Sequence, residues 1–391
     1  MPVSAPKKIG LYPHWPFCER KCPYCDFNSY TVSDLPHDAY RNAVLQDFAR
    51  RREYYGEARL VSVYIGGGTP SLMRPNDLAM LLDAIHRRDE LSGAEITIEA
   101  NPHSALPGWL REVRNLGVNR LSLGIQSFDP EILGFLGRLH DSDQAKAAIN
   151  AAREAGFENL GLDLILATKV SSKQSLESDL QTLLSFSPEH VSAYLLGVET
   201  NTPFGKRESL GEIMGLPDEE AIIHAERVSR FLQNAGYEHY EISNFAQPKR
   251  RAVHNSLYWE GADYLGLGPG AHSFLRSSSA HSATRSETLR NPWEYFESVS
   301  SAKAVLEFEE HLEAADLARE TVMTALRRRE GLGEKEFAER TGLNLFSRYN
   351  SVISDLIERR YLELFENQDE RRIRLSMQSW WISDSVFLEF F

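Results

Sequence analysis

Short apolar runs alternate with longer amphipathic segments through the first half of the chain. The apolar runs resemble β-strands and cover residues 8–14, 60–66, 94–100, 118–124, 159–166 and 190–197. Between them, apolar residues recur at helical spacing, and several of these segments end at glycine; examples are 75–88, 106–117 and 142–156. Strands separated by single helices predict right-handed βαβ crossovers and a parallel sheet. Six such units predict an α/β fold with a partial (β/α)6 barrel, rather than a closed eightfold barrel.

The second half of the chain predicts a different organisation. A long helix is expected over 217–236, followed by an irregular aromatic region that contains a surface loop at 277–286. From residue 306 the pattern predicts three helices and then two β-like runs, over 310–329, 333–340, 346–360, 361–366 and 371–376. Three helices and a hairpin resemble a winged helix, so a C-terminal winged-helix-like α+β domain is expected. We therefore predict domains at 1–245, 246–305 and 306–391.

Composition and charge argue against several classes of protein. The net charge of −13 argues against a nucleic-acid-binding protein held by bulk charge. No apolar run approaches the roughly 18–20 residues needed to cross a bilayer. The segment "MPVSAPKKIG" lacks the apolar centre of a secretory signal. Three cysteines do not suit a disulfide scaffold, so we expect a soluble protein in the reducing cytoplasm.

All three cysteines lie in one short stretch, "FCERKCPYC". Cys18, Cys22 and Cys25 have the spacing C-x3-C-x2-C. A structural zinc site prefers four closed ligands, and only His14 lies near enough in sequence to be a fourth. A cubane iron–sulfur cluster usually takes four cysteines, so three leave one iron open to another ligand. The spacing therefore favours a 4Fe-4S cluster over zinc, and either metal site over free thiols.

This cysteine motif, placed after the first predicted strand, resembles the radical S-adenosylmethionine (SAM) superfamily. The chain is similar in detail to the coproporphyrinogen III oxidase-like group, over nearly its whole length. The similarity rests on "LYPHWPFC" (11–18), "GGGTP" (66–70), "EANP" (99–102) and "GIQSF" (124–128), in this order. In that family the open iron binds the methionyl amino and carboxylate groups of SAM. Reduction of the cluster then cleaves SAM to a deoxyadenosyl radical.

The resemblance implies a set of SAM-binding residues at the strand ends. They are Tyr12, Tyr24, Gly67, Gly68, Thr69, Glu99, Gln126, Arg138 and Asp163. Glycines let the backbone approach a zwitterion closely, and a guanidinium can pair with a carboxylate. Simpler interpretations stay open: a strand-end turn for the glycines, an ion pair of Glu99 with Arg120, a solvated helix position for Arg138 and core packing for Tyr12.

One segment departs from the family pattern. After the aspartate of the fifth strand, Asp163, the family continues with a Gly-Leu-Pro turn, whereas this chain has "LILATKVSSKQS" at 164–175. The loop that helps to form the floor of the SAM pocket is therefore expected to differ. A different loop would change the surroundings of Asp163 in the SAM pocket, and with them the role of Asp163 and the efficiency of SAM cleavage.

Two branches of the group share these motifs. The oxidase branch carries a further cysteine two residues after the last ligand, where this chain has Phe27. The heme chaperone branch (HemW type) has phenylalanine there, together with His-Asn-x-x-Tyr-Trp. This chain has "HNSLYW", which implies heme binding at His254, Asn255, Tyr258 and Trp259. Neutral imidazole is a good axial ligand for heme iron. The alternative is a hydrogen-bonded core histidine in an aromatic segment.

The sequence thus predicts a radical SAM heme chaperone that binds heme, a 4Fe-4S cluster and SAM, and transfers heme to an acceptor protein. It also implies an electron donor for the cluster, no nucleic acid, and membrane contact only through the acceptor. The runner-up is an oxygen-independent coproporphyrinogen III oxidase of porphyrin biosynthesis, so whether the chain is an enzyme stays open. A regulatory module is the weakest alternative, because the mixed charge of 346–360 does not suit a DNA-recognition helix.

Overall fold

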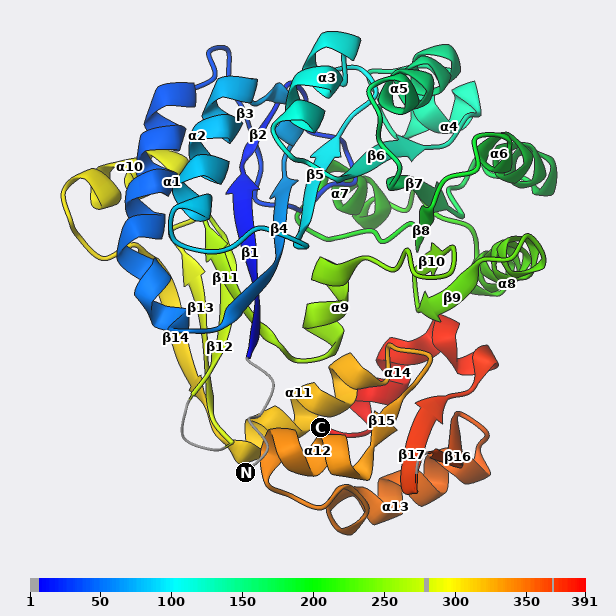
Figure 1. The fold of residues 1–391 in the computed structure, drawn as a ribbon. Coiled ribbons are helices and arrows are strands. Elements are labelled where there is room, and N and C mark those ends of the chain that lie inside the picture. Colours follow the sequence, from blue (N-terminus) through cyan, green and yellow to red (C-terminus); the bar gives the residue numbers. More distant parts are fainter. Residues whose placement is uncertain (1–6, 278–280, 368) are drawn as a thin grey trace.

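The computed structural model describes residues 7–277, 281–367 and 369–391 (Figure 1). Most of the predicted non-signal N-terminus, residues 1–6, and the middle of the predicted 277–286 loop lie outside these ranges. In the described parts the main sheet has 12 strands, in the order β14-β13-β12-β11-β1-β4-β5-β6-β7-β8-β10-β9. A second sheet has the order β15-β17-β16, and a third pairs β2 with β3.

The predicted βα units form the centre of the main sheet. Its strands β1 (Lys8–Trp15), β4 (Arg59–Gly67), β5 (Glu95–Ala100), β6 (Arg120–Gln126), β7 (Leu160–Leu166) and β8 (His190–Leu195) pair in parallel. The helices of these units line the outer face of the curved sheet in Figure 1. They are α1 (His37–Arg51), α2 (Pro75–His86), α3 (Pro107–Asn115), α4 (Pro130–Phe135), α5 (Ser142–Glu154), α6 (Lys173–Ser185) and α8 (Asp218–Asn234). The predicted partial barrel of six parallel strands is confirmed.

Short elements complete this part of the chain. They are β2 (Phe17–Cys18), β3 (Tyr30–Thr31), the 3-10 helices η1 (Arg52–Tyr55) and η2 (Pro70–Leu72), and helix α7 (Pro203–Ser209). β2, which ends at Cys18, pairs in parallel with β3, and the segment between them carries Cys22 and Cys25. We call residues 18–29 the cysteine loop.

Both edges of the sheet extend beyond the prediction. β11 (Asp263–Leu267) adds a parallel strand beside β1, and β12 (His272–Arg276), β13 (Ala283–Thr288) and β14 (Leu306–Leu312) follow in antiparallel order. At the other edge lie β10 (Asn244–Ala246) and β9 (Glu238–Glu241). The segment expected to be irregular also holds α9 (Val253–Trp259) and α10 (Pro292–Ser300).

Two predicted boundaries were wrong for this reason. The expected surface loop at 277–286 gives way to β13 at Ala283. The helix expected from residue 310 begins only at Ala314, because Leu306–Leu312 is an edge strand. Most of that strand is exposed and acidic, so it lacks the apolar alternation that marks a half-buried strand.

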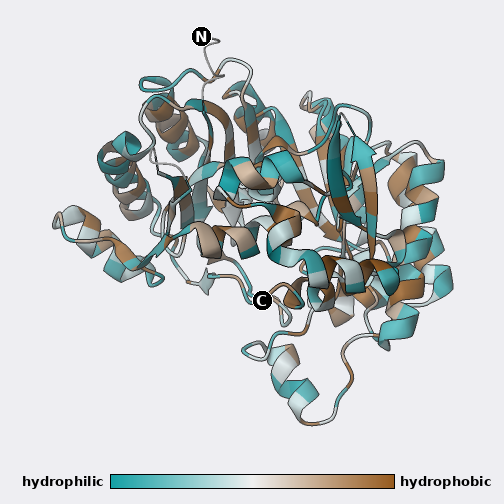
Figure 2. Cartoon of the chain, turned by 90° about the horizontal axis from the view of Figure 1, so that it is seen from below, coloured by the Kyte–Doolittle hydropathy of each residue, from teal (hydrophilic) through white to brown (hydrophobic). Residues whose placement is uncertain are grey.

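The C-terminal part has its own apolar core. It is built from α11 (Ala314–Ala325), β15 (Leu332–Gly333), α12 (Glu334–Thr341), α13 (Leu345–Glu358), β16 (Leu362–Asn367), β17 (Glu370–Leu375), η3 (Met377–Ile382) and α14 (Ser383–Leu388). Helices that alternate with a short strand and end in a hairpin form the winged-helix-like domain that the sequence predicted. Figure 2 shows hydrophobic and hydrophilic residues alternating along the helices, as expected where one side of a helix is buried. No helix in the described ranges is long and apolar enough to span a bilayer.

Helix α9 lies on the concave side of the sheet, against β4 and β1 (Figure 1). Its N-terminus is capped from β5, because the carboxylate of Glu95 accepts hydrogen bonds from the amides of Val253 (3.0 Å) and His254 (3.1 Å). A carboxylate at this end meets otherwise unpaired N–H groups and the positive end of the helix dipole. The "HNSLYW" motif is thereby fixed inside the partial barrel.

Candidate functional site

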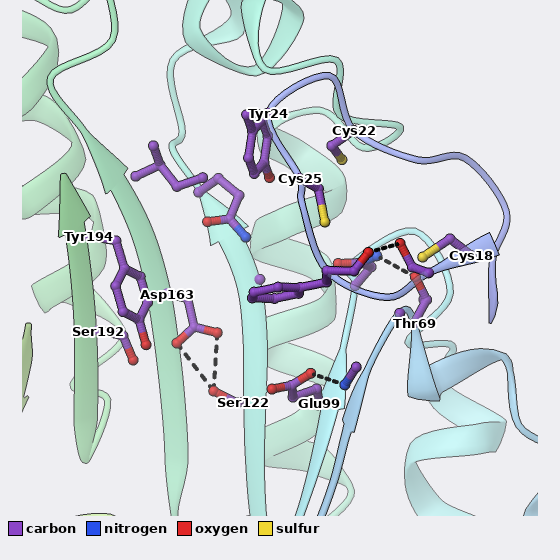
Figure 3. A pocket seen from close by; sticks show the side chains of 18 of the residues that line it. Cys18, Cys22, Tyr24, Cys25, Thr69, Glu99, Ser122, Asp163, Ser192 and Tyr194 are labelled. Carbon is purple, nitrogen blue, oxygen red and sulfur yellow. Dashed lines mark hydrogen bonds between the residues drawn. The ribbon is translucent and has the colours of Figure 1, made fainter. Parts of the chain in front are cut away.

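The carboxyl ends of the parallel strands surround a cavity of about 380 Å³. We call it the first cavity. Figure 3 shows the cysteine loop on one side of it and carboxylates from the strands below. All of the predicted SAM-binding residues except Tyr12 line it: Tyr24, Gly67, Gly68, Thr69, Glu99, Gln126, Arg138 and Asp163. Residues from four strands meet here because the ends of parallel strands lie at one edge of the sheet.

The three cysteines all line the first cavity. Cys18 is buried in β2, whereas Cys22 and Cys25 are half-buried and joined by a turn, Cys25 N to Cys22 O at 3.1 Å. Burial raises the pKa of the Cys18 and Cys25 thiols. Among the described residues, no three His, Cys, Asp or Glu side chains converge as a single metal ion would need. In a cubane each thiolate binds a different iron, so three separated thiols on one loop suit a cluster better than zinc.

His14 is not arranged as a fourth ligand in this structure. Its Nε2 atom lies 3.0 Å from the carbonyl oxygen of Asn28, and it is buried beneath the glycine segment. Burial lowers the pKa of His14 to about 4, so its ring is neutral. We assign it to positioning the cysteine loop.

The glycine segment forms a close cradle at the end of β4. Gly67 has a φ of +116°, and a Cβ there would lie 2.8 Å from His14 Nε2. A Cβ on Gly68 would lie 2.7 Å from the Phe17 carbonyl oxygen and 3.0 Å from Cys18 Sγ. Both positions therefore require glycine, and without side chains the backbone beside the first cysteine can approach a ligand closely.

Glu99 faces the cavity from the end of β5. Its carboxylate accepts hydrogen bonds from the Tyr64 hydroxyl (2.7 Å) and the Gly67 amide (3.1 Å). Burial is the largest influence on its pKa, which is raised to about 7. The alternative ion pair with Arg120 is not formed, since Arg120 Nε is nearest to Glu95, at 4.0 Å. Glu99 is therefore available to a cationic group of a ligand.

Arg138 is held above the strand ends rather than in solvent. Its Nη2 atom donates to Asn101 Oδ1 (2.6 Å) and to the Gly124 carbonyl (2.9 Å). Its Nη1 atom lies 3.4 Å from both Cys22 Sγ and the Tyr24 hydroxyl. The Nε atom is buried and has no hydrogen-bond partner in the described structure. A guanidinium held with Nη1 beside Cys22 suits a ligand carboxylate.

Asp163 and Gln126 line the cavity from β7 and β6. Both oxygens of Asp163 accept from Ser122 Oγ, at 3.2 and 3.1 Å, and burial raises the pKa of this carboxyl (Figure 3). Gln126 has a φ of +68°, which turns the chain out of the strand. The segment that departs from the family contributes Ala167 and Ser171 to a small neighbouring cavity, while Asp163 itself stays on the first cavity.

The strand ends also bring in residues that the sequence analysis did not select. Ser192 and Tyr194 of β8 line the first cavity, as does Arg120 of β6. Ser192 and Tyr194 are two positions apart, so they share one face of the strand. The rule that functional groups gather at the carboxyl ends of parallel strands applies equally to β8 and was a usable signal.

His254 is the most enclosed residue of the "HNSLYW" motif. It is buried, with Nδ1 2.8 Å from Ser62 Oγ and Nε2 2.9 Å from the Tyr258 hydroxyl. Its ring stacks on Tyr64 at 5.1 Å, and burial lowers its pKa to about 3. The imidazole is therefore neutral, as an iron ligand must be, but both of its nitrogens are already engaged.

The other members of the motif face different surroundings. Asn255 lines the first cavity. Tyr258 instead lines a second cavity, and the Trp259 ring lies 5.3 Å from the Arg327 guanidinium of the C-terminal domain. The motif is thus shared between two cavities and a domain contact rather than gathered on one surface.

The second cavity, of about 660 Å³, adjoins the first. Lys21, Asp26, Phe27 and Ser29 of the cysteine loop border both, as does Gly67. Tyr12, the predicted SAM residue missing from the first cavity, lies here, and its ring stacks on Tyr64 at 5.9 Å.

Family comparison is consistent with this arrangement. Residues 12–183 match the model of the Radical SAM superfamily, and residues 312–382 match the HemN C-terminal domain. A solved structure of coproporphyrinogen III oxidase (HemN) from Escherichia coli covers 98% of this chain and 90% of its own, with a TM-score of 0.81 and 21% identity. That similarity shows the fold alone.

Curated relatives cover almost the whole chain. Heme chaperone HemW of Bacillus subtilis is 32% identical over 97% of this chain and 98% of its own length. Heme chaperone HemW of Escherichia coli is 36% identical over 86% of both chains. Because relatives at 32% and 36% identity cover the chain almost throughout, the chain belongs to the HemW family of the radical SAM superfamily.

Proposed function

We propose that this protein is a heme chaperone that binds heme beside a 4Fe-4S cluster and SAM and delivers the heme to an acceptor protein. The observation that carries the proposal is the 32% identity to a relative named heme chaperone, which spans 97% of the chain and so includes both cavities. The proposal includes a cytoplasmic setting, an electron donor for the cluster, and membrane contact only through the acceptor.

The residues of the first cavity fit the cluster and SAM. Cys18, Cys22 and Cys25 would hold three irons, and the remaining iron would supply an open coordination position and electrons for SAM. Gly67 and Glu99 offer backbone groups and a carboxylate that would accept hydrogen bonds from the iron-bound methionyl amino group, and the Arg138 guanidinium beside Cys22 would pair with the methionyl carboxylate. Asp163 presents acceptor oxygens toward ribose hydroxyls. These assignments use only groups that already line the cavity.

Phe27 favours the chaperone over the oxidase. Its side chain is 61% exposed and lies on the border between the two cavities. It offers an apolar surface and no ionisable group where the oxidase branch has a thiol. Contact with such a ring stabilises the binding of a flat apolar ligand. The ring has no group that could transfer a proton or an electron.

The test is heme binding and transfer by protein reconstituted anaerobically with iron, sulfide and SAM. We expect hemin to give a saturable one-site change in Soret difference spectra. Heme should then pass to a respiratory apo-hemoprotein faster than it passes to a passive heme-scavenging apoprotein. A non-saturating titration, or equal transfer to both recipients, would contradict a chaperone.

A further inference from the structure

The second cavity adjoins the one that fits SAM, and its lining combines aromatic rings with charged and polar side chains. It lies between β1, α9, the cysteine loop and the antiparallel strands β12 and β13. Its aromatic lining consists of Tyr12, Phe27, Tyr30, Tyr258 and Tyr264. A volume of about 660 Å³ falls within the roughly 300–1,000 Å³ typical of cofactor and small-molecule pockets.

We infer that this second cavity is the heme subsite and that His272 supplies the axial ligand to the heme iron. The inference rests on the proposed chaperone function and specifies where the cargo lies. It assigns a role to a histidine outside the "HNSLYW" motif, in the segment "GLGPGAHSF".

The His272 ring is accessible from the second cavity, whereas the His254 ring is not. Its side chain is 51% exposed at the start of β12 and lines the second cavity. Its Nε2 atom lies 3.6 Å from Glu287 Oε1, so a carboxylate faces one nitrogen and leaves Nδ1 for iron. A carboxylate behind a metal-binding imidazole orients the ring and strengthens it as a ligand. His254 is enclosed and lines neither cavity.

In this arrangement, residues of the α9 motif fix the aromatic wall of the subsite. His254 Nε2 holds the hydroxyl of Tyr258 at 2.9 Å, and the Tyr258 ring meets Tyr264 edge to face at 4.6 Å. A fixed aromatic pair of this kind can pack against a porphyrin face. Phe27 adds an exposed ring from the cysteine loop. In this arrangement His254 is a positioning residue and His272 is the ligand.

Charged groups at the cavity can receive the two propionates of heme. Arg290 and Lys21 both line the cavity, and a guanidinium or an ammonium pairs with carboxylates. Glu287 also lines it but is paired with Arg290, at 2.6 Å, and Asp26 lies on the loop. Because cations and carboxylates are both present, we attribute recognition mainly to the aromatic walls and the histidine, with the cations placing the propionates.

The cysteine loop is tied to this subsite. The side-chain amide of Asn28 donates to the carbonyls of Pro269 (3.1 Å) and Arg290 (3.0 Å), and a Cβ on Gly270 would collide with it. Heme in the second cavity would therefore contact the same loop that carries the cysteines.

The test compares three histidine variants in anaerobically reconstituted protein: His272→Ala, His254→Gln and, as a control, the exposed His86→Ala. Hemin is titrated by Soret difference spectra, and axial ligation is read by resonance Raman spectroscopy. We expect His272→Ala to weaken hemin binding at least tenfold and lose the histidine-ligated spectrum, with added imidazole restoring it. His254→Gln should weaken binding less and keep the spectrum, and His86→Ala should match wild type. Iron, sulfide and SAM binding should stay unchanged in His272→Ala.

The outcomes separate the inference from the proposed function. If wild type binds hemin saturably and His272→Ala retains its affinity and spectrum, the second-cavity assignment is overturned while the chaperone stands. If only His254→Gln loses the histidine-ligated spectrum, the axial ligand is His254 on α9 and the assignment to His272 is wrong. If wild type shows no saturable binding, the chaperone itself fails, and the inference fails with it.

Discussion

The Glu99 carboxylate accepts a hydrogen bond from the backbone amide of Gly67, with Oε2 and N 3.1 Å apart. This bond joins the carboxyl ends of β4 and β5 across the floor of the first cavity (Figure 3). Tyr64 donates to the other oxygen at 2.7 Å, so the carboxylate has a fixed orientation. The glycine cradle and Glu99 thus face the cavity as one preformed unit for a cationic group.

We expect Glu99→Gln to weaken SAM binding at least tenfold, because a neutral amide is a weaker hydrogen-bond acceptor than a carboxylate for the iron-bound amino group and carries no charge to offset the positive charge of SAM. Since the pKa of Glu99 is raised to about 7, wild-type affinity should increase as the pH rises from 6 to 8, whereas the variant should show little change. Equilibrium dialysis of anaerobically reconstituted protein would measure both. Tyr64→Phe is the control, since it removes one hydrogen bond and keeps the charge. A parallel pH response in Glu99→Gln would contradict this role.

Cys22→Ser should abolish cluster assembly while leaving the fold intact. The hydroxyl of serine is a poor iron ligand but can still accept the contact from Arg138 Nη1, which lies 3.4 Å from Cys22 Sγ. Iron and sulfide content after anaerobic reconstitution, with the visible absorbance, would be compared with Asp26→Asn on the same loop. We expect full loading in Asp26→Asn and almost none in Cys22→Ser. Wild-type iron and sulfide in Cys22→Ser would rule out the three-cysteine cluster.

The sequence predicted the strand ends well, because each βα unit is a short, regular segment and all parallel strands end at the same edge of the sheet. Once Gly67, Glu99 and Gln126 were placed at the ends of successive strands, their shared cavity followed from topology, whereas Asp163, which lies inside β7, was assigned from the family resemblance. The edge strands were missed for the opposite reason. Leu306–Leu312 is largely exposed and acidic, so neither periodicity nor hydrophobicity identified it.

The second cavity was not predictable from local pattern, because its walls come from distant segments. The state of His254 depends on Ser62, which lies 192 residues away, so the sequence left open whether its nitrogens were free. Tyr12 was expected near SAM from the family resemblance, yet it lines the second cavity together with Tyr258. The motifs identified the residues, and the tertiary structure distributes them between two cavities.

The protein should not convert coproporphyrinogen III to protoporphyrinogen IX, even with a full cluster, SAM and a reductant. Phe27 places an exposed aromatic ring, with no ionisable group, where the oxidase branch has cysteine. Product would be measured by porphyrin fluorescence after oxidation, with the Escherichia coli oxidase as the positive control. Repeated turnover by this chain would favour the decarboxylase and count against the chaperone.

Glu241 gives a pH dependence of stability that is independent of either cavity. This β9 carboxyl is buried, and burial is the main cause of its raised pKa of about 7. When the pKa of an acid is higher in the folded than in the unfolded protein, its contribution to the free energy of unfolding is greatest below the unfolded pKa. That contribution is lost as the pH rises toward the folded pKa, because the carboxyl must then ionise in a buried position. Glu241 should therefore lower the free energy of unfolding progressively between about pH 4.5 and 7, and by a constant amount above that.

We expect Glu241→Gln to stabilise the protein at pH 8 by up to about 3 kcal/mol, since each pKa unit corresponds to about 1.4 kcal/mol. Glutamine keeps an oxygen that accepts from the Ser243 amide and removes the buried charge. Urea unfolding at pH 5.5 and pH 8 would show a larger gain at the higher pH, with Glu307→Gln on the exposed edge strand as control. An equal gain at both pH values would mean that packing, rather than the ionisation of Glu241, sets the difference.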